Sequence, residues 1–341
     1  MDLEALNDIA TRMVAPGQGI LAADESTGTI KKRFDTIGLD STEDNRRDWR
    51  EMLFRTAPAM KERISGVILY DETIRQKAAD GTPLVKLIAD SGTVPGIKVD
   101  TGAKALAAAP GETVTEGLDG LRERLNEYHE IGARFAKWRA VIHIGGSGDE
   151  DIPSQYCIDT NMHALARYAA LCQEAGIVPI VEPEVLMDGD HTIERCYEVT
   201  EFALKALYSE LFKQSVQLEG TILKPNMVIS GSDCADQATP EEVADMTVQC
   251  LANCVPASVP GIAFLSGGQT DLQATSHLNI MNAAYDLPWP LTFSYGRALQ
   301  ASPLKAWGKS KDVTAGQKAF NHRAQMNGLA ALGEWNESME G

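Results

Sequence analysis

The chain has 341 residues, of which 44% are hydrophobic and 23% charged, and its formal net charge is −17. The length suits one large α/β barrel with extensions, because a (β/α)8 barrel takes about 250 residues before insertions. The acidic balance argues against sequence-independent nucleic-acid binding, which depends on clustered lysine and arginine.

No run in the sequence approaches the ~20 apolar residues that cross a bilayer. The acidic start, Met1-Asp2-Leu3-Glu4, lacks the features of a signal peptide. The six cysteines include no C-x-x-C pair, so we expect reduced thiols. These features predict a cytoplasmic protein with no membrane contact.

After an N-terminal helical extension over residues 1–17, eight apolar runs of strand length follow along the chain. Helix-like stretches fill most of the gaps, such as Leu118–Gly132, Asn161–Gly176 and one that opens at Pro240 with acids in its first turn. The runs are Gly19–Asp24, Gly66–Glu72, Gly96–Asp100, Phe135–Ile142, Ile177–Glu184, Gly220–Lys224, Gly261–Gly267 and Leu291–Gly296.

Strands that alternate with helices predict a parallel sheet, and eight such units predict closure into a (β/α)8 TIM barrel. The alternative is an open doubly wound sheet, but no G-x-G-x-x-G turn follows the first strand to favour it. We expect a single domain over residues 1–341, with residues 325–341 as a short C-terminal tail.

Charged residues gather at the ends of these predicted strands, where barrel active sites lie. Because strand side chains alternate between faces, Lys137 and Arg139 share one face, and so do Glu182 and Glu184. A lone lysine at a strand end is usually only solvated, but a whole set predicts a cleft in which opposite charges pair. The set comprises Asp24, Lys98, Asp100, Lys137, Arg139, Glu182, Glu184, Lys224 and Arg297.

Lys224 and Glu182 each precede a proline, which biases a residue toward extended backbone and holds the side chain at a strand exit. A lysine amine attacks a carbonyl only when neutral, and burial beside a second ammonium, for which Lys137 is the candidate, favours that form. Glu182 could carry protons to and from the carbinolamine. We therefore predict that Lys224 forms a Schiff base with a sugar-phosphate ketone.

The turns after the last two strands are rich in glycine, which lets backbone N–H groups approach a phosphate closely. They are Ser266-Gly267-Gly268 and Ser294-Tyr295-Gly296-Arg297, and Arg297 adds a two-pronged donor. The six histidines show no paired spacing, so we expect neither a metal nor a cofactor.

Several longer motifs resemble those of class I fructose-bisphosphate aldolases. The resemblance extends from about residue 5 to about residue 330 and rests on GILAADESTG from Gly19, GIKVD from Gly96, FAKWR from Phe135, IVPIVEPE from Ile177, LEGTILKPNM from Leu218, FLSGGQ from Phe264 and LTFSYGRALQ from Leu291. It implies metal-free, reversible cleavage of fructose 1,6-bisphosphate to dihydroxyacetone phosphate and glyceraldehyde 3-phosphate.

By similarity, Lys224 is the Schiff-base lysine and Glu182 its acid/base, while Asp24 helps to deprotonate the C4 hydroxyl. Lys137 would lie close by, with Glu184 in the same charge network. The resemblance places Lys98 and Arg139 at the C6 phosphate and carries over Arg46 as a further substrate contact. The C1 phosphate or its surroundings would contact Ser26, Arg33, Ser266, Gly267, Ser294, Gly296 and Arg297.

Two departures and one carry-over complete the comparison with the family. Thr29 stands where animal members have serine, which keeps the hydroxyl. Animal members end in a tail whose terminal tyrosine assists protonation of the enamine, whereas the last tyrosine here is Tyr295, so we expect another group or water to act and the chain to be a bacterial-type member. The family also implies a homotetramer.

Two alternative functions stay open from the sequence. A Schiff-base aldolase could act on another ketose phosphate, such as tagatose 1,6-bisphosphate or fructose 1-phosphate. A barrel that only binds a partner would have lost at least one of the four residues that carry the chemistry. All four are present, which favours the enzyme: Asp24, Lys137, Glu182 and Lys224.

Overall fold

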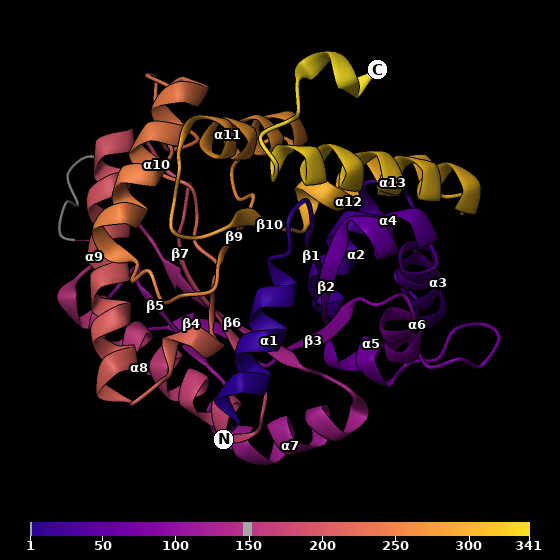
Figure 1. The fold of residues 1–341 in the computed structure, drawn as a ribbon, viewed down its shortest axis with the longest axis horizontal. Helices are drawn as coiled ribbons and strands as arrows, with labels where there is room; N and C mark the ends of the chain where they lie inside the picture. Colours follow the sequence, from indigo (N-terminus) through magenta and orange to yellow (C-terminus); the bar gives the residue numbers. More distant parts are fainter. Residues whose placement is uncertain (1, 146–151) are drawn as a thin grey trace.

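A closed barrel of eight parallel strands forms the centre of the molecule (Figure 1). The computed structural model describes residues 2–145 and 152–341. Around the barrel the strands follow the order β1-β10-β9-β8-β7-β6-β3-β2. The predicted barrel is confirmed, and each strand falls within or overlaps a predicted run: β1 (Gly19–Ala23), β2 (Ile64–Leu69), β3 (Val94–Lys98), β6 (Phe135–Ile142), β7 (Val178–Val185), β8 (Ile222–Leu223), β9 (Ile262–Phe264) and β10 (Leu291–Tyr295).

Helices surround the barrel (Figure 1), and several of them begin at a residue whose side chain caps the first turn, as at α2, α3, α8 and α9. α10 begins at Pro240 with acids in its first turn, as the sequence predicts, and the structure adds a reciprocal capping box between Thr239 and Glu242. The helices of the layer are α2 (Thr27–Asp35), α3 (Glu43–Phe54), α4 (Ala57–Glu62), α5 (Asp71–Arg75), α6 (Leu84–Asp90), α7 (Leu121–Ile131), α8 (Gln155–Glu174), α9 (Ile193–Lys213), α10 (Pro240–Cys254), α11 (Asp271–Ala284), α12 (Arg297–Trp307) and α13 (Val313–Ala330), with a 3-10 turn η1 (Leu218–Gly220) before β8.

The first helix, α1 (Leu3–Met13), closes the N-terminal end of the barrel. Its buried face, Leu6, Ala10 and Met13, packs in one cluster with inward-facing side chains from the strands. Those strand residues are Ile20, Ile68, Val94, Phe135, Val178, Ile180, Ile222 and Ala263. Because this end is filled with apolar side chains, polar chemistry is confined to the opposite end.

A small antiparallel hairpin, β4 (Gly102–Ala105) with β5 (Thr113–Glu116), follows β3 and was not predicted. It is held to β6 by threonine hydroxyls: Thr115 donates to the carbonyl of Arg139 at 2.7 Å and Thr113 to that of Val141 at 3.0 Å. The hairpin strands are short and partly exposed, so they lack the apolar runs of the barrel strands.

Two predicted boundaries differ in the structure. Asp71 and Glu72 open α5 instead of ending β2. Helix α13 continues to Ala330, so residues 325–330 belong to a packed helix and not to a tail. Gly328 allows this packing, since a Cβ there would lie 2.7 Å from the carbonyl oxygen of Gly17. A last 3-10 turn, η2 (Glu337–Glu340), follows. Within the described residues, every helix is too short or too polar to traverse a lipid bilayer.

Candidate active site

A cavity of about 630 Å³ opens at the C-terminal ends of the barrel strands. Fourteen of the sixteen residues predicted for catalysis or substrate binding line it, brought together from seven strands, the turns that follow them and helices α2 and α12. They are Asp24, Ser26, Arg33, Lys98, Lys137, Arg139, Glu182, Glu184, Lys224, Ser266, Gly267, Ser294, Gly296 and Arg297. Thr29, the residue that departs from the animal pattern, also lines it.

The two exceptions are Arg46 and Gly268, which do not line this cavity. Arg46 is buried in α3 and donates to both carboxylate oxygens of Glu72 and to the carbonyl of Ser41. Its guanidinium is therefore occupied by protein groups. Gly268 has a φ of +75° and packs on Met187, so it shapes the turn and does not face the substrate space.

Lys224 and Glu182 meet at the bottom of the cavity, with Lys224 Nζ 3.1 Å from Glu182 Oε1. Both side chains are almost completely buried. The exits of β7 and β8 are fixed to each other by one backbone and one side-chain hydrogen bond, because Lys224 N donates to the carbonyl of Val181 and Val185 N donates to the side-chain Oδ1 of Asn226. The Schiff-base candidate and its acid/base candidate are thus held at hydrogen-bonding distance by neighbouring strands.

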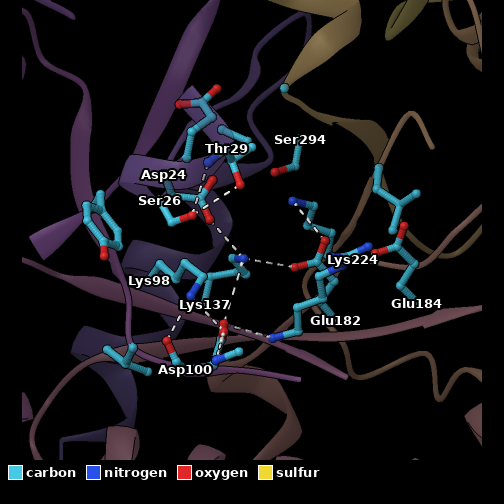
Figure 2. A pocket seen from close by; sticks show the side chains of 18 of the residues that line it. Asp24, Ser26, Thr29, Lys98, Asp100, Lys137, Glu182, Glu184, Lys224 and Ser294 are labelled. Carbon is cyan, nitrogen blue, oxygen red and sulfur yellow. Dashed lines mark hydrogen bonds and ion pairs between the residues drawn. The ribbon is translucent and has the colours of Figure 1, made fainter. Parts of the chain in front are cut away.

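Lys137, from β6, lies at the centre of the charge network (Figure 2). Its Nζ is 2.8 Å from Asp24 Oδ2, 3.4 Å from Glu182 Oε2 and 3.9 Å from Asp100 Oδ2. Burial by itself would lower the pKa of Lys137, but these three carboxylates outweigh burial and raise its pKa. Lys137 is therefore an ammonium at neutral pH.

The same field keeps the catalytic carboxyl candidates ionised. Burial would raise the pKa of Asp24, yet the ammonium groups of Lys137 and Lys224 bring that pKa down to about 2. Burial is likewise outweighed at Glu182, where Lys224, Lys137 and then Arg139 lower the pKa. Both carboxylates are proton acceptors in the unliganded protein at neutral pH.

At the rim, the two cations expected at the C6 phosphate are paired with carboxylates. Lys98 Nζ lies 2.7 Å from Asp100 Oδ1 and also donates to the Asp100 carbonyl, while Arg139 forms an ion pair with Glu184. Asp100 further accepts from the backbone N–H of Gly102 at 3.2 Å. The strand-end pattern included Asp100, and the structure makes it a centre of the rim network.

The opposite wall, at the ends of β9 and β10, suits an anion (Figure 2). Ser294 Oγ is buried and has no hydrogen-bond partner among the described residues. Gly296 and Arg297 begin α12, where backbone N–H groups are free to bind a phosphate. No carboxylate of the described chain lies within 4 Å of the Arg297 guanidinium. This wall offers hydroxyl, N–H and guanidinium donors in one place.

Sequence reasoning missed several residues around the site. Glu25 is buried and accepts from Arg33 and from Gln300 Nε2, while Arg50, fully buried in α3, donates to the Glu25 carbonyl at 2.8 Å. Arg124 also lines the cavity. The helical arginines carry no sequence signal, because a charged residue on a helix most often faces solvent.

Known proteins that are similar to this chain in sequence and in structure bear the name of one enzyme. The family model "Fructose-bisphosphate aldolase class-I" matches residues 5–341. "Probable fructose-bisphosphate aldolase class 1" of Xanthomonas campestris pv. campestris is 62% identical over 98% of this chain and 99% of that protein. Human "Fructose-bisphosphate aldolase C" is 52% identical over 98% of this chain and 92% of its own length. A solved structure of fructose-bisphosphate aldolase from Plasmodium falciparum superposes with a TM-score of 0.94 at 46% identity, covering 98% and 96% of the two chains.

Proposed function

We propose that Lys224 carries the Schiff base of this chain, which belongs to the class I fructose-bisphosphate aldolase family. The chain is a lyase that reversibly cleaves fructose 1,6-bisphosphate to dihydroxyacetone phosphate and glyceraldehyde 3-phosphate. The observation that carries the assignment is the buried contact of 3.1 Å between Lys224 Nζ and Glu182 Oε1, with a second ammonium, Lys137, on the other carboxylate oxygen.

In the first half-reaction Glu182 takes a proton from Lys224, the neutral amine attacks the C2 carbonyl, and a second proton moves from the nitrogen to the former carbonyl oxygen to give the carbinolamine. Glu182 then returns a proton to the departing hydroxyl, so that water leaves and an iminium remains. The lowered pKa of Glu182 supports this order, because the carboxylate starts in the form that accepts a proton.

In the second half-reaction Asp24 removes the proton of the C4 hydroxyl. The C3–C4 bond breaks, its electron pair moves to form the enamine on the Lys224 adduct, and the aldehyde product leaves. Asp24 suits this step because its carboxylate is held ionised beside Lys137 at 2.8 Å. Protonation of the enamine carbon and hydrolysis of the iminium release the ketose fragment.

The two phosphates would occupy opposite walls. Ser266, Gly267, Ser294, Gly296 and Arg297 surround the C1 phosphate, with the unpartnered Ser294 hydroxyl and the α12 N-terminus as donors. Lys98 and Arg139 line the C6 end. Neither side requires a metal in this mechanism.

The test is borohydride trapping with dihydroxyacetone phosphate, followed by mass mapping. We expect a stable adduct on the peptide that contains Lys224, and none in Lys224→Ala. Lys318→Ala, a lysine substitution outside the cavity lining, serves as the control. Full aldolase activity in Lys224→Ala would refute the assignment. Coupled assays with fructose 1,6-bisphosphate, tagatose 1,6-bisphosphate and fructose 1-phosphate rank the substrates.

We also propose that the protein is a cytoplasmic homotetramer. The six cysteines are all unpaired, which supports a reducing compartment. Light scattering after gel filtration should give four times the mass of one chain, and a monomer mass at micromolar concentration would overturn the assembly.

A further inference from the structure

Seven cationic and six carboxylate side chains line the cavity, so the site has little net charge although its substrate carries two phosphates. Most of the cations have a carboxylate within 4 Å: Arg33 with Glu25, Lys98 with Asp100, Lys137 with Asp24, Arg139 with Glu184 and Lys224 with Glu182. Within residues 2–145 and 152–341, the exceptions among the lining cations are Arg297 and Arg124.

Arg297 belongs to the wall assigned above to the C1 phosphate. Arg124 comes from α7, outside the barrel, and reaches the cavity beside the exit of β3. In the barrel order, β3 is separated from β10 by β2 and β1. The two cations without a carboxylate partner therefore belong to different parts of the rim, as a substrate with a phosphate at each end requires.

Backbone carbonyls fix the guanidinium of Arg124. Nη1 donates to the carbonyl of Val99 at 3.0 Å and Nη2 to that of Gly117 at 2.6 Å. A carbonyl satisfies an N–H without neutralising the positive charge, unlike the carboxylates that pair with Lys98 and Arg139. Arg124 is thus oriented by two carbonyl groups, and no carboxylate of the described residues pairs with its positive charge.

The nearby carboxylate on this side of the cavity, Asp71, is engaged by other groups. Tyr128 donates its hydroxyl to Asp71 Oδ1 at 2.9 Å, and Arg75 Nε donates to the same atom at 2.9 Å. Arg75 also pairs with Glu127. Asp71 therefore has two partners of its own, and among the described residues it forms no ion pair with Arg124.

We propose that Arg124 is a specificity-determining residue that favours bisphosphates over monophosphates, because it supplies the uncompensated positive charge at the C6 end. The inference rests on the proposed function. Lys98 and Arg139 contribute donors there, but their charges are largely cancelled by Asp100 and Glu184. An uncancelled charge in a cleft acts on an anion beyond contact distance.

The experiment compares kcat/KM for fructose 1,6-bisphosphate with kcat/KM for fructose 1-phosphate. Arg124→Gln removes the charge but keeps a donor for the carbonyls, and we expect the ratio of the two values to fall by about tenfold, mainly through the bisphosphate. Arg124→Lys keeps the charge and should hold the ratio within about threefold. Arg122→Gln is the matched control, because Arg122 is two residues away on α7, pairs with Glu174 at 2.6 Å and does not line the cavity.

If Arg124→Gln leaves the ratio of the two kcat/KM values unchanged, whether both values fall by the same factor or neither falls, the proposal is overturned. Arg124 would then only hold the backbone at Val99 and Gly117 in place. Thermal unfolding checks the fold of each variant, and Arg124→Met serves as a second neutral variant if the glutamine variant does not fold. Failure of the proposed function is seen separately, as absence of cleavage and of a trapped adduct in the wild type.

Discussion

Replacing Glu182 by glutamine separates the two proton-transfer roles that the site contains. The amide has nearly the same size as the carboxylate and can still accept a hydrogen bond from Lys224. It cannot take up a proton, and it removes the negative charge that lies 3.1 Å from Lys224 and 3.4 Å from Lys137. We therefore expect a loss of proton transfer in a correctly shaped site.

The magnitude follows from the step that is lost. A positioned general acid/base contributes about 10²- to 10⁴-fold, which corresponds to roughly 3–5 kcal/mol of barrier. We expect Glu182→Gln to slow both Schiff-base formation and overall cleavage by a factor in this range. The assay is the single-turnover rate of borohydride-trapped adduct with dihydroxyacetone phosphate, set beside steady-state kcat for fructose 1,6-bisphosphate.

The Asp24→Asn variant is the comparison that distinguishes the role of Glu182 from that of Asp24. Asp24 pairs with Lys137 at 2.8 Å, and no ion pair within the described residues joins it to Lys224. Asp24→Asn should therefore form the trapped adduct at a rate within about tenfold of wild type while cleavage falls by about 10²-fold or more. If Glu182→Gln traps as fast as wild type, or if the two variants lose trapping equally, the division of roles between Glu182 and Asp24 is refuted.

Three further outcomes follow from the geometry. Lys137→Met should raise the pKa of Asp24 from about 2 by roughly 1–3 units, because Lys137 is the strongest of the groups that oppose the effect of burial. Since Asp24 acts as a carboxylate, the pH at which kcat/KM falls on the acid side should rise with that pKa. An acid-side fall at the wild-type pH would contradict the coupling between Lys137 and Asp24. Gly268→Ala should lower the free energy of unfolding in urea by about 1–3 kcal/mol, because φ is +75° and the new Cβ would lie 2.4 Å from Met187 Cγ. Gly28→Ala, with open space around the new Cβ, is the control. Equal urea midpoints for the Gly268→Ala variant and the wild type would show that the turn adapts. Dialysis against EDTA should leave cleavage of fructose 1,6-bisphosphate at its starting rate, and complete loss that Zn²⁺ restores would argue against the Schiff-base route.

The barrel could be predicted because its strands are buried on both faces and so appear as continuous apolar runs. β1 and β2 are buried at every position, and the runs around them stand out from the amphipathic helices. The hairpin of β4 and β5 could not be predicted in this way. Its strands are short and partly exposed, and its place is set by threonine hydroxyls that contact β6, some 25 residues away in sequence.

The position of α1 is a similar case. The sequence predicts a helical extension over residues 1–17, and α1 (Leu3–Met13) lies within it, but its own residues do not show which surface its apolar face will cover. Leu6, Ala10 and Met13 find their partners in the strand starts only after the barrel has closed. The local sequence thus predicted the helix, whereas its role in closing one end of the barrel depends on tertiary contacts.

The site residues also divide into those that the local sequence could predict and those that depend on tertiary packing. Residues at strand ends could be assigned because parallel strands in a barrel bring their C-terminal ends together, whatever the loops do. Arg46, on a helix and not at a strand end, was carried over from the family resemblance alone, and the structure pairs it with Glu72 outside the cavity. Arg50 and Arg124 lie on helices, and only the packing of α3 and α7 against the barrel shows that Arg124 lines the cavity and that Arg50 holds Glu25, which lines it.

The charge pairs of the strand ends also explain why residues outside the strands matter. Burying Lys137 or Lys224 requires a carboxylate within contact distance, because an isolated buried charge is strongly unfavourable. The same pairing cancels the field that would attract an anionic substrate. A site built from strand ends alone would therefore be stable and poised for proton transfer, yet nearly neutral toward a bisphosphate. The attraction has to come from cations held by groups that do not cancel them, such as the carbonyl-bound Arg124 and the Arg297 that begins α12.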